Sequence, residues 1–302
     1  MKKHFKKLLL MALMAVMAVG LIACGTDKSD NESTKEEKTS VTITSLDASK
    51  NEIELEVPYN PKRIAILDLA CLDIIDELGV GDRVVGMAST SIDYLEKYSN
   101  DASIKNLGTI KEADLEAVME CEPDIIFIGG RLSKSYDALS EIAPVVYLAT
   151  DTNEGLVNSV SKNAKTIASI FGMEDKVDSL MSDFGARIDT IKKISSGKTA
   201  LVGMTTSGSF NLLGNDGRCS LIGVEAGFNN LTAAGSTSTH GNESSFETVV
   251  QQNPDYIFVM DRDSAISTAG AKTAKEIVEN ELVKTTDAYK NNHIIYLEHS
   301  NV

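Results

Sequence analysis

The stretch EPDIIFIGGR at residues 122–131 decides the fold, because the chain repeats its pattern as NPDYIFVMDR at residues 253–262, 131 positions later. Each stretch has Pro-Asp near its start, continues as an apolar run and ends in a single arginine. A short apolar run bounded by Pro or Gly is typical of a strand that is buried on both faces of a sheet. The sequence therefore predicts the same buried strand twice, each time ending in a cation.

The repeat extends upstream into a helical segment in each copy. Aligning residues 114–131 with residues 245–262 gives seven identities in eighteen positions. The identical pairs are Glu116/Glu247, Val118/Val249, Pro123/Pro254, Asp124/Asp255, Ile126/Ile257, Phe127/Phe258 and Arg131/Arg262. Sequence preferences common to α/β proteins can account for the Pro-Asp and apolar matches, whereas the matched glutamates and arginines need another explanation.

Strand-like and helical segments alternate along the chain around this repeat. Before residue 150 they run in the order RIAIL, LACLDIIDELG, RVVGM, DLEAVMECE, PDIIFIGG, SYDALSEIA and PVVYL, and from Lys198 they resume with TALVGM, PDYIFVM and HIIYL. Alternation of this kind indicates helices packed on a mostly parallel sheet. The sequence therefore predicts two α/β units.

Residues 156–194 lie between these units and read as helix without an intervening strand. Apolar residues recur there at three- and four-residue intervals, at Val177, Leu180, Phe184, Ile188 and Ile191, after an earlier helical stretch that stops at Gly172. We predict an α/β fold of two Rossmann-like lobes with parallel-rich sheets, joined by a long spine helix, with a ligand cleft between the lobes. The N-terminal lobe is predicted at residues 41–150, the helical linker at 156–194 and the C-terminal lobe at 197–302.

The N-terminus, MKKHFKKLLLMALMAVMAVGLIAC, has four lysines in its first seven residues and an apolar run from Leu8 to Ala23. This run is too short for a stable membrane span, so residues 1–23 are predicted to be an export signal peptide. The last four residues, Leu-Ile-Ala-Cys, look like a bacterial lipobox, in which Cys24 is diacylated and becomes the first mature residue. An ordinary signal peptide followed by an incidental cysteine is the alternative.

Residues 25–40, GTDKSDNESTKEEKTS, contain no large apolar residue and are predicted to form a solvated tether. Together with a lipidated Cys24, this tether predicts a protein anchored by lipid to the cell membrane on its extracytoplasmic face. The folded part is expected to begin near Val41.

The composition is that of a globular, strongly acidic protein. The chain has 302 residues, 42% of them hydrophobic, and a net charge of −15 that becomes −19 once residues 1–23, with four lysines and no acids, are removed. Such a charge argues against nucleic acid as a partner. After Cys24 the chain keeps Cys71, Cys121 and Cys219, an odd number without a C-x-x-C pair, so neither a disulfide framework nor a zinc site is expected. Cys71 lies in an apolar run and is expected to be buried.

Four residues are candidates for a binding site at the carboxyl ends of the strands, where open parallel sheets bind ligands. Arg131 and Arg262 each follow a predicted strand, Arg218 lies in the loop GNDGRCSLIG, and His240 lies in the loop STSTHGNESS. Three arginines and a histidine at one edge would form a local anion site in an acidic protein. The alternative for each is an ordinary solvent-exposed or salt-bridged residue.

The segments THGNESSFETVVQQNPDYIFVMDRDSAI and ENELVKTTDAYKNNHIIYLE, with the lipobox, resemble the lipoprotein solute-binding proteins of ABC importers for ferric catecholate siderophores. These proteins form the class with a rigid helical spine. The resemblance covers the chain from about residue 41 onward. Its specific parts are the T-H-G loop, the Gly-Gly-Arg and Asp-Arg after the repeated strands, and the Gly-x-x-x-Arg that ends at Arg218.

This resemblance implies roles for each candidate residue. Arg131, Arg218 and Arg262 would hold the anionic catecholates, and His240 would ligate the Fe³⁺ of a tetradentate siderophore, which leaves two of six iron positions open. The ferric siderophore would be the transported ligand, with no permanently bound cofactor, and we expect a monomer. Glu116 and Glu247 would contact arginines of the membrane permease, one from each lobe; the alternative is that both simply favour the first turns of their helices.

In this family a tyrosine in a Trp-Tyr-Leu stretch, soon after the last strand, supplies the second iron ligand. The present sequence has no tryptophan and ends at Val302. We therefore expect either a fragment that is incomplete at its C-terminus or a protein that lacks this ligand. Tyr296 lies within the last predicted strand and is a poor substitute.

Two other classes of function compete with siderophore binding. An enzyme is not expected, because the sequence has no G-x-S-x-G, H-E-x-x-H, Walker loop or dinucleotide glycine motif. The same binding fold could instead serve haem or cobalamin, since arginines also suit haem propionates. A bare divalent metal would need more converging histidines and carboxylates than the T-H-G loop offers.

Overall fold

In a computed structural model of the chain, the described residues are 38–151, 154–217, 219–232, 238, 240–265, 270 and 272–297. The predicted signal peptide, Cys24, most of the tether and Arg218 lie outside the described residues. None of the described helices is long and apolar enough to cross a membrane.

The folded part begins with an antiparallel hairpin of β1 (Ser40–Leu46) and β2 (Glu52–Pro58). The hairpin was not predicted, although both strands alternate apolar and polar residues. Ser45 joins it to the next sheet, because its hydroxyl accepts a hydrogen bond from the Tyr147 backbone N–H at 3.0 Å and is itself buried.

The N-terminal sheet consists of five parallel strands in the order β5-β4-β3-β6-β7. The strands are β3 (Ile64–Leu67), β4 (Val84–Met87), β5 (Lys105–Asn106), β6 (Ile125–Ile128) and β7 (Val145–Tyr147), and the helices are α2 (Leu69–Leu78), α3 (Glu96–Ser99), α4 (Leu115–Glu120) and α5 (Tyr136–Ser140), with 3₁₀ turns at Gly81–Arg83, Asp93–Leu95 and Gly130–Ser135. β3 and β6 are fully buried and pack into a separate hydrophobic core on each face of the sheet. Their continuous apolar sequences follow from this two-sided burial.

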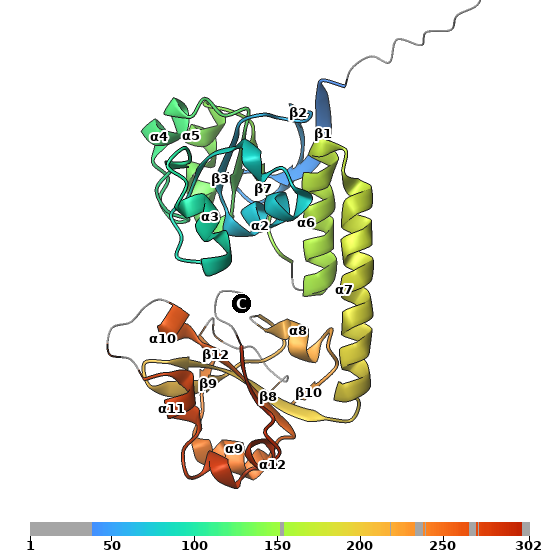
Figure 1. The fold of residues 1–302 in the computed structure, drawn as a ribbon, viewed down its shortest axis with the longest axis vertical. Helices are drawn as coiled ribbons and strands as arrows, with labels where there is room; N and C mark the ends of the chain where they lie inside the picture. Colours follow the sequence, from blue (N-terminus) through green and yellow to red (C-terminus); the bar gives the residue numbers. More distant parts are fainter. Residues whose placement is uncertain are drawn as a thin grey trace, which may run out of the picture. The chain divides into compact units, whose positions relative to one another are not determined.

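Two helices, α6 (Leu156–Phe171) and α7 (Glu174–Ser195), follow the N-terminal sheet and lie side by side (Figure 1). The chain turns from α6 to α7 at Gly172, which caps the C-terminus of α6. Only glycine fits there, because φ is +67° and an added Cβ would lie 2.2 Å from the Tyr59 hydroxyl oxygen. α7 has 22 residues, which corresponds to a length of about 33 Å. Val177 and Ile188, from the predicted apolar stripe, are its buried hydrophobic residues.

The C-terminal sheet has the order β11-β9-β8-β12-β13, with β10 also paired to β8. Its strands are β8 (Thr199–Thr206), β9 (Ser209–Leu212), β10 (Asn229–Asn230), β11 (Asn242–Glu243), β12 (Tyr256–Asp261) and β13 (Ile294–Leu297), and its helices are α8 (Ser220–Gly223), α9 (Phe246–Gln252), α10 (Arg262–Ala265), α11 (Ala274–Val278) and α12 (Asp287–Lys290), with a 3₁₀ turn at Val283–Thr285. β8, β10, β12 and β13 are parallel, whereas β9 and β11 are antiparallel to their neighbours. This sheet is therefore more mixed than the N-terminal one.

The sequence repeat is also a structural repeat. Asp114 and Ser245, which are 131 positions apart, cap the N-termini of α4 and α9 with their side chains. Glu122 and Asn253, also 131 positions apart, have φ values of 43° and 41° at the turns that follow these helices. β6 and β12 then occupy equivalent places, each paired in parallel with the first strand of its own sheet.

The repeated aspartates have a structural role that explains the Pro-Asp match. Asp124 Oδ2 accepts backbone hydrogen bonds from Lys62 and Arg63, at 2.7 and 2.9 Å, where β3 begins. Asp255 Oδ2 accepts hydrogen bonds from the backbone N–H and hydroxyl of Thr199, at 2.9 and 3.0 Å, where β8 begins. Each aspartate therefore fixes the start of the neighbouring strand.

Replacing Asp255 with asparagine is expected to lower the free energy of unfolding by about 1 kcal/mol at pH 7, because a charged acceptor becomes neutral. The backbone hydrogen bond from Thr199 holds the pKa of Asp255 below its ordinary value of 3.8. A lowered pKa means that this contribution is present above pH 3.8 and is lost as the pH falls through and below that value. The side chain is 37% exposed, so solvent screening keeps the effect small.

Urea unfolding at neutral and acidic pH tests this expectation. The wild-type protein should lose more stability than Asp255→Asn as the pH falls below about 4, whereas Asp137→Asn, a change at an exposed aspartate, should follow the wild type. Identical pH dependence for wild type and Asp255→Asn contradicts the role given to this carboxylate.

Candidate functional site

Arg131 lies just beyond the carboxyl end of β6, in the 3₁₀ turn Gly130–Ser135, and its side chain is exposed. It lines a hollow of about 400 Å³ together with Leu67 and Asp68 at the end of β3. Gly129 permits this arrangement, because a Cβ there would lie 2.1 Å from a carboxylate oxygen of Asp68. The Gly-Gly-Arg sequence therefore reflects the close approach of two strand ends, and it leaves the guanidinium free to reach into the hollow.

Arg262 occupies the equivalent position beyond β12, as the first residue of α10. Its guanidinium donates a hydrogen bond to the Thr206 hydroxyl at 3.2 Å and lies 3.8 Å from the Asp263 carboxylate. The Asp263 side chain is buried and accepts the Ser207 backbone N–H at 2.7 Å. Arg262 is therefore held at the carboxyl end of β8 and β12, with 32% of its side chain exposed. A guanidinium has five donors, so it can still bind an anion.

His240 lies in the loop before β11, and its side chain is exposed. The loop is held through backbone contacts: the Asn211 amide donates to the His240 carbonyl at 2.9 Å. Gly241, with φ of +74°, could not carry a Cβ, which would lie 2.9 Å from the Leu212 carbonyl oxygen. The glycine of the T-H-G sequence is therefore required by the close approach of this loop to β9, and the loop presents the imidazole to solvent.

These residues are not joined to one another directly. Within the part of the chain that the structure describes, no hydrogen bond or ion pair links Arg131, Arg262 and His240. Arg131 and Arg262 each lie at the carboxyl edge of their own sheet, whereas β11, which follows His240, pairs with β9 at the side of the C-terminal sheet. Arg218 lies outside the described residues.

Glu225 links the segment after α8 to the start of α6, and no motif in the sequence predicts this role. Its carboxylate accepts the Val157 backbone N–H at 3.2 Å, at the start of α6, where the capping residue Gly155 has no side chain. Glu225 follows α8, so the bond ties the segment after Arg218 to the paired helices, and the negative charge suits a helix N-terminus. Ser195, the last residue of α7, adds a 2.6 Å hydrogen bond to the Ala226 carbonyl.

Glu116 and Glu247 are both the second residue of a helix and both are exposed. The caps Asp114 and Ser245 precede them at equivalent positions. Each carboxylate therefore lies in a first helical turn, where the helix dipole favours it, and each also faces solvent, where a partner protein could reach it.

Tyr296 in β13 is held as a neutral phenol. Its hydroxyl donates to the Glu279 carboxylate at 3.1 Å. Burial and the neighbouring carboxylate raise the pKa of Tyr296 well above its ordinary value of 10.0. Iron binds the phenolate form, so a ligand role for Tyr296 would require loss of its hydrogen bond to Glu279.

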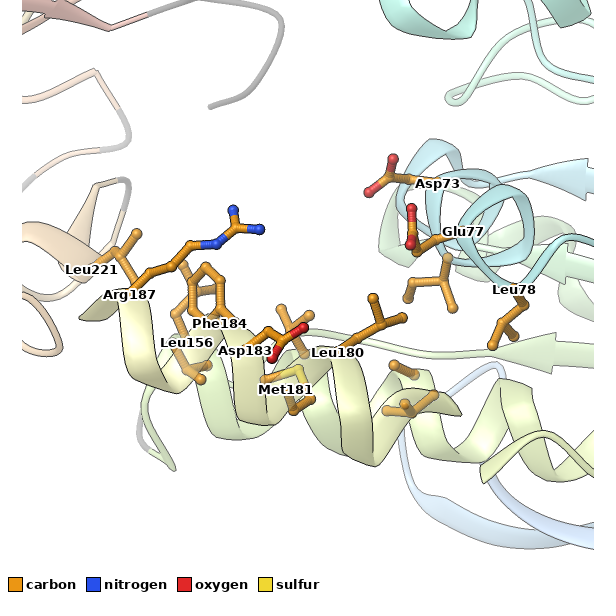
Figure 2. Close-up of a pocket in the computed structure, with 15 residues that line it drawn as sticks. Asp73, Glu77, Leu78, Leu156, Leu180, Met181, Asp183, Phe184, Arg187 and Leu221 are labelled. Atoms are coloured by element: carbon orange, nitrogen blue, oxygen red, sulfur yellow. The ribbon is translucent and has the colours of Figure 1, made fainter. Parts of the chain in front are cut away.

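A larger hollow of about 460 Å³ lies between α2, α6 and α7. Figure 2 shows the carboxylates of Asp73 and Glu77 and the guanidinium of Arg187 directed into it, above apolar walls that include Leu180 and Phe184. Burial and the carboxylates of Asp76 and Glu77 raise the pKa of Asp73. Asp183 also lines the hollow, so three carboxylates face one guanidinium there, and this excess of negative charge makes the hollow unsuited to an anionic ligand despite its size.

The thiols and possible metal ligands of the described residues do not add to the site. Cys71, predicted to be buried, is buried, as is Cys121, and Cys219 is partly exposed. Among the described residues, no group of three or more His, Cys, Asp or Glu could hold a metal ion.

The family model of the periplasmic binding proteins matches residues 64–300. The chain belongs to this family. It is 36% identical to the petrobactin-binding protein YclQ of Bacillus subtilis, over 97% of this chain and 91% of YclQ. The crystal structure of YclQ superimposes with a TM-score of 0.78, covering 87% of this chain and 90% of that one.

A second solved structure, the catecholate-siderophore binding protein VctP of Vibrio cholerae, is 30% identical with a TM-score of 0.76 and covers 86% of this chain and 92% of VctP. The ferric-anguibactin-binding protein FatB of Vibrio anguillarum is 26% identical over 80% of this chain and 76% of FatB. These likenesses confirm the family resemblance seen in the sequence and the predicted α/β class with parallel strands and a long helix.

Proposed function

We propose that this chain is the substrate-binding component of an ABC importer, and that it captures the anionic ferric complex of a catecholate siderophore and delivers it to the permease. The observation that carries the proposal is the pair of equivalent arginines, Arg131 and Arg262, at the carboxyl edges of two sheets in a protein of net charge −15. Membership of the periplasmic binding protein family supports it, as do the ligands named for YclQ and VctP.

The chemistry of these side chains suits such a ligand. Ferric catecholates carry negative charge on planar, oxygen-rich rings, and a guanidinium offers permanent charge, forked donors and a stacking face. Arg131, Arg218 and Arg262 form the proposed anion site. The exposed imidazole of His240 is proposed to take one of the iron positions that a tetradentate siderophore leaves open. Iron enters only as part of the transported ligand, so no permanent cofactor and no catalytic turnover are proposed.

The organisation of the chain follows from this site. We infer an N-terminal lobe at residues 41–150, a helical linker at 156–194 and a C-terminal lobe at 197–302, with the ligand bound between the lobes. The carboxyl-edge positions of Arg131 and Arg262 support this reading, because such edges are where open α/β sheets bind ligands. Size-exclusion chromatography with light scattering checks the proposed monomer, and a stable dimer contradicts it.

Titration of the purified protein against a panel of ligands tests the proposed function. The panel contains ferric petrobactin, ferric citrate, haem, cobalamin and one further ferric catecholate that is hexadentate. Retention of the catecholate-to-iron charge-transfer band on the protein supports the proposal. Binding of haem alone, seen as a Soret band, or of cobalamin alone supports the other ligand class, and binding of neither contradicts both.

A lipid anchor at Cys24 is proposed from the lipobox and from relatives named as lipoproteins, such as YhfQ of Bacillus subtilis, which is 26% identical over 97% of this chain and 91% of its own length. The anchor would keep the protein at the extracytoplasmic face of the cell membrane. Mass spectrometry of the mature N-terminus tests it, and a mature protein without a diacylated Cys24 contradicts it.

Glu116→Ala and Glu247→Ala are each expected to reduce uptake of the ferric siderophore by cells while leaving its affinity in solution nearly unchanged. Both carboxylates are exposed in first helical turns of equivalent helices, and charges at an interface chiefly orient docking and set the association rate. Radio-iron uptake and equilibrium binding measure the two effects, with Asp137→Ala as an exposed control on α5. Normal uptake by the double variant contradicts docking, and lost ligand affinity assigns these residues to the ligand site.

A further inference from the structure

The two proposed docking helices differ in what surrounds their glutamates. On α4, Leu115 precedes Glu116, and Met119 follows four positions after Leu115. The two apolar side chains are 39% and 61% exposed. Met119 is the most exposed large hydrophobic side chain among the described residues. Residues at i and i+4 share one face of a helix, so α4 presents an apolar pair beside its carboxylate.

The equivalent positions on α9 do not present such a pair. Phe246, 131 positions after Leu115, packs partly buried against the core, with its ring stacked on Phe210 at a centroid distance of 6.3 Å. Val250, 131 positions after Met119, is also partly buried. The exposed apolar surface is therefore confined to one of the two repeats.

The charges around the two helices differ in the same sense. Five exposed acidic residues lie on α4 or within three positions of its ends, namely Glu112, Asp114, Glu116, Glu120 and Glu122. The residues 131 positions later are Glu243, Ser245, Glu247, Gln251 and Asn253, of which two are acidic. Lys105 pairs with Glu120 and Lys111 is exposed next to Glu112, so the net charge of this group is −3, against −2 for the equivalent positions of the second repeat, where Ser236 and Asn242 replace the lysines.

We propose that docking on the permease is unequal: the α4 surface, formed by Leu115, Met119 and the acidic residues around them, is the main anchor, and the α9 surface is a weaker second contact. The proposed occupant is one permease subunit that offers basic side chains around an apolar recess. This inference rests on the proposed function as an importer component. It goes beyond the paired glutamates, which by themselves predict two equal contacts.

Apolar burial and charge both contribute to binding at such a surface. An apolar centre within a charged rim is the usual composition of a protein interface, and a few buried anchors carry most of the binding energy. Methionine suits such an anchor, because its unbranched side chain adapts to an irregular recess. The acidic rim would speed and orient association with a basic surface.

Three single variants separate this inference from a general effect of surface polarity. Met119→Gln removes the apolar anchor, Val250→Thr makes the smaller change at the equivalent position of α9, and Ile194→Gln changes a residue of similar exposure, 56%, on α7. Binding of each protein to the permease–ATPase complex in lipid nanodiscs is measured directly by biolayer interferometry, with and without ferric petrobactin. Ligand affinity and melting temperature are measured in parallel.

Met119→Gln is expected to weaken binding to the complex about tenfold, which is the effect of losing roughly 1.4 kcal/mol of apolar burial. Val250→Thr and Ile194→Gln are expected to change it less than about twofold, and none of the three should alter ligand affinity. Equal effects of Met119→Gln and Val250→Thr, or an effect of Met119→Gln no larger than that of Ile194→Gln, overturn the inference. If the wild-type protein does not bind the ferric siderophore, the proposed function is overturned instead. Binding of the variants to the permease–ATPase complex without ligand still shows whether the α4 surface is the main anchor.

Discussion

Arg262→Gln is expected to weaken the binding of a ferric catecholate by about 1–3 kcal/mol, or roughly 5- to 150-fold, because a charge-assisted contact to the ligand is lost. The Thr206 hydroxyl and the Asp263 carboxylate already hold this guanidinium at the carboxyl end of two strands. A preorganised group loses less conformational entropy on binding, so more of its interaction energy appears as affinity.

Arg131 provides an internal comparison. Its side chain is exposed and has no hydrogen bond or ion pair among the described residues. The ligand must therefore order it, which costs about 0.5–1.5 kcal/mol for a long side chain. Arg131→Gln is expected to cost less affinity than Arg262→Gln, although both positions belong to the same repeat.

Equilibrium binding of ferric and gallium complexes of the same catecholate measures these effects. Charge recognition does not depend on the redox properties of the metal, so each arginine variant should lose affinity for both complexes equally. Arg187→Gln is the matched control, because Arg187 lines the hollow between α2, α6 and α7 and does not lie at the carboxyl edge of a sheet. An Arg262→Gln protein that binds like the wild type, or a similar loss in Arg187→Gln, contradicts the anion site.

The sequence was sufficient to predict the buried parallel strands, whereas the β1–β2 hairpin, which is also a local pattern, was not predicted. Buried parallel strands such as β6 and β12 have continuous apolar sequences, and the 131-position repeat identified Arg131 and Arg262 as equivalent before their places were known. The same repeat matched Asp124 with Asp255, but it did not show that each fixes the start of a neighbouring strand. That role depends on Arg63 and Thr199, which lie 61 and 56 positions away from the two aspartates. A match in sequence alone does not name such partners.

Contacts between distant parts of the chain account for the rest. Glu225 accepts a hydrogen bond from a residue 68 positions away, and Ser45 joins the first hairpin to Tyr147 across 102 positions. The antiparallel β8–β9 hairpin was within reach of sequence reasoning, because Ser207-Gly208 is a two-residue turn with φ values of 52° and 81°. Arg218 lies outside the described residues, so its place at the site stays a prediction.

His240→Ala is expected to distinguish metal ligation from charge recognition. A tetradentate siderophore leaves two iron positions open, whereas a hexadentate one leaves none, so only the tetradentate complex can accept an imidazole from the protein. Loss of an outer-shell partner of a metal ligand typically costs about 10- to 100-fold in affinity, and loss of the ligand itself should cost at least as much. Binding of the hexadentate complex should change less than about threefold on the same reasoning.

The local structure makes this variant a clean test. The loop is held by the Asn211 hydrogen bond to the His240 backbone carbonyl and by the close packing of Gly241, so removing the imidazole leaves both contacts in place. His293→Ala is the matched control, because His293 lies at the end of β12 opposite to Arg262. Its ring stacks on Tyr256 with a centroid distance of 4.2 Å, and its Nδ1 is hydrogen-bonded to the Asp255 carbonyl.

Absorbance and equilibrium binding together decide the role of His240. If its nitrogen binds iron, His240→Ala should shift the charge-transfer band of the bound tetradentate ferric complex, since an inner-sphere ligand is replaced by water, and His293→Ala should not. Gallium should show the same selective loss of affinity, because it has the same coordination requirement without the iron absorbance. Equal losses for tetradentate and hexadentate complexes, with an unshifted band, mean that His240 is only a loop residue, and the anion site then rests on the arginines alone.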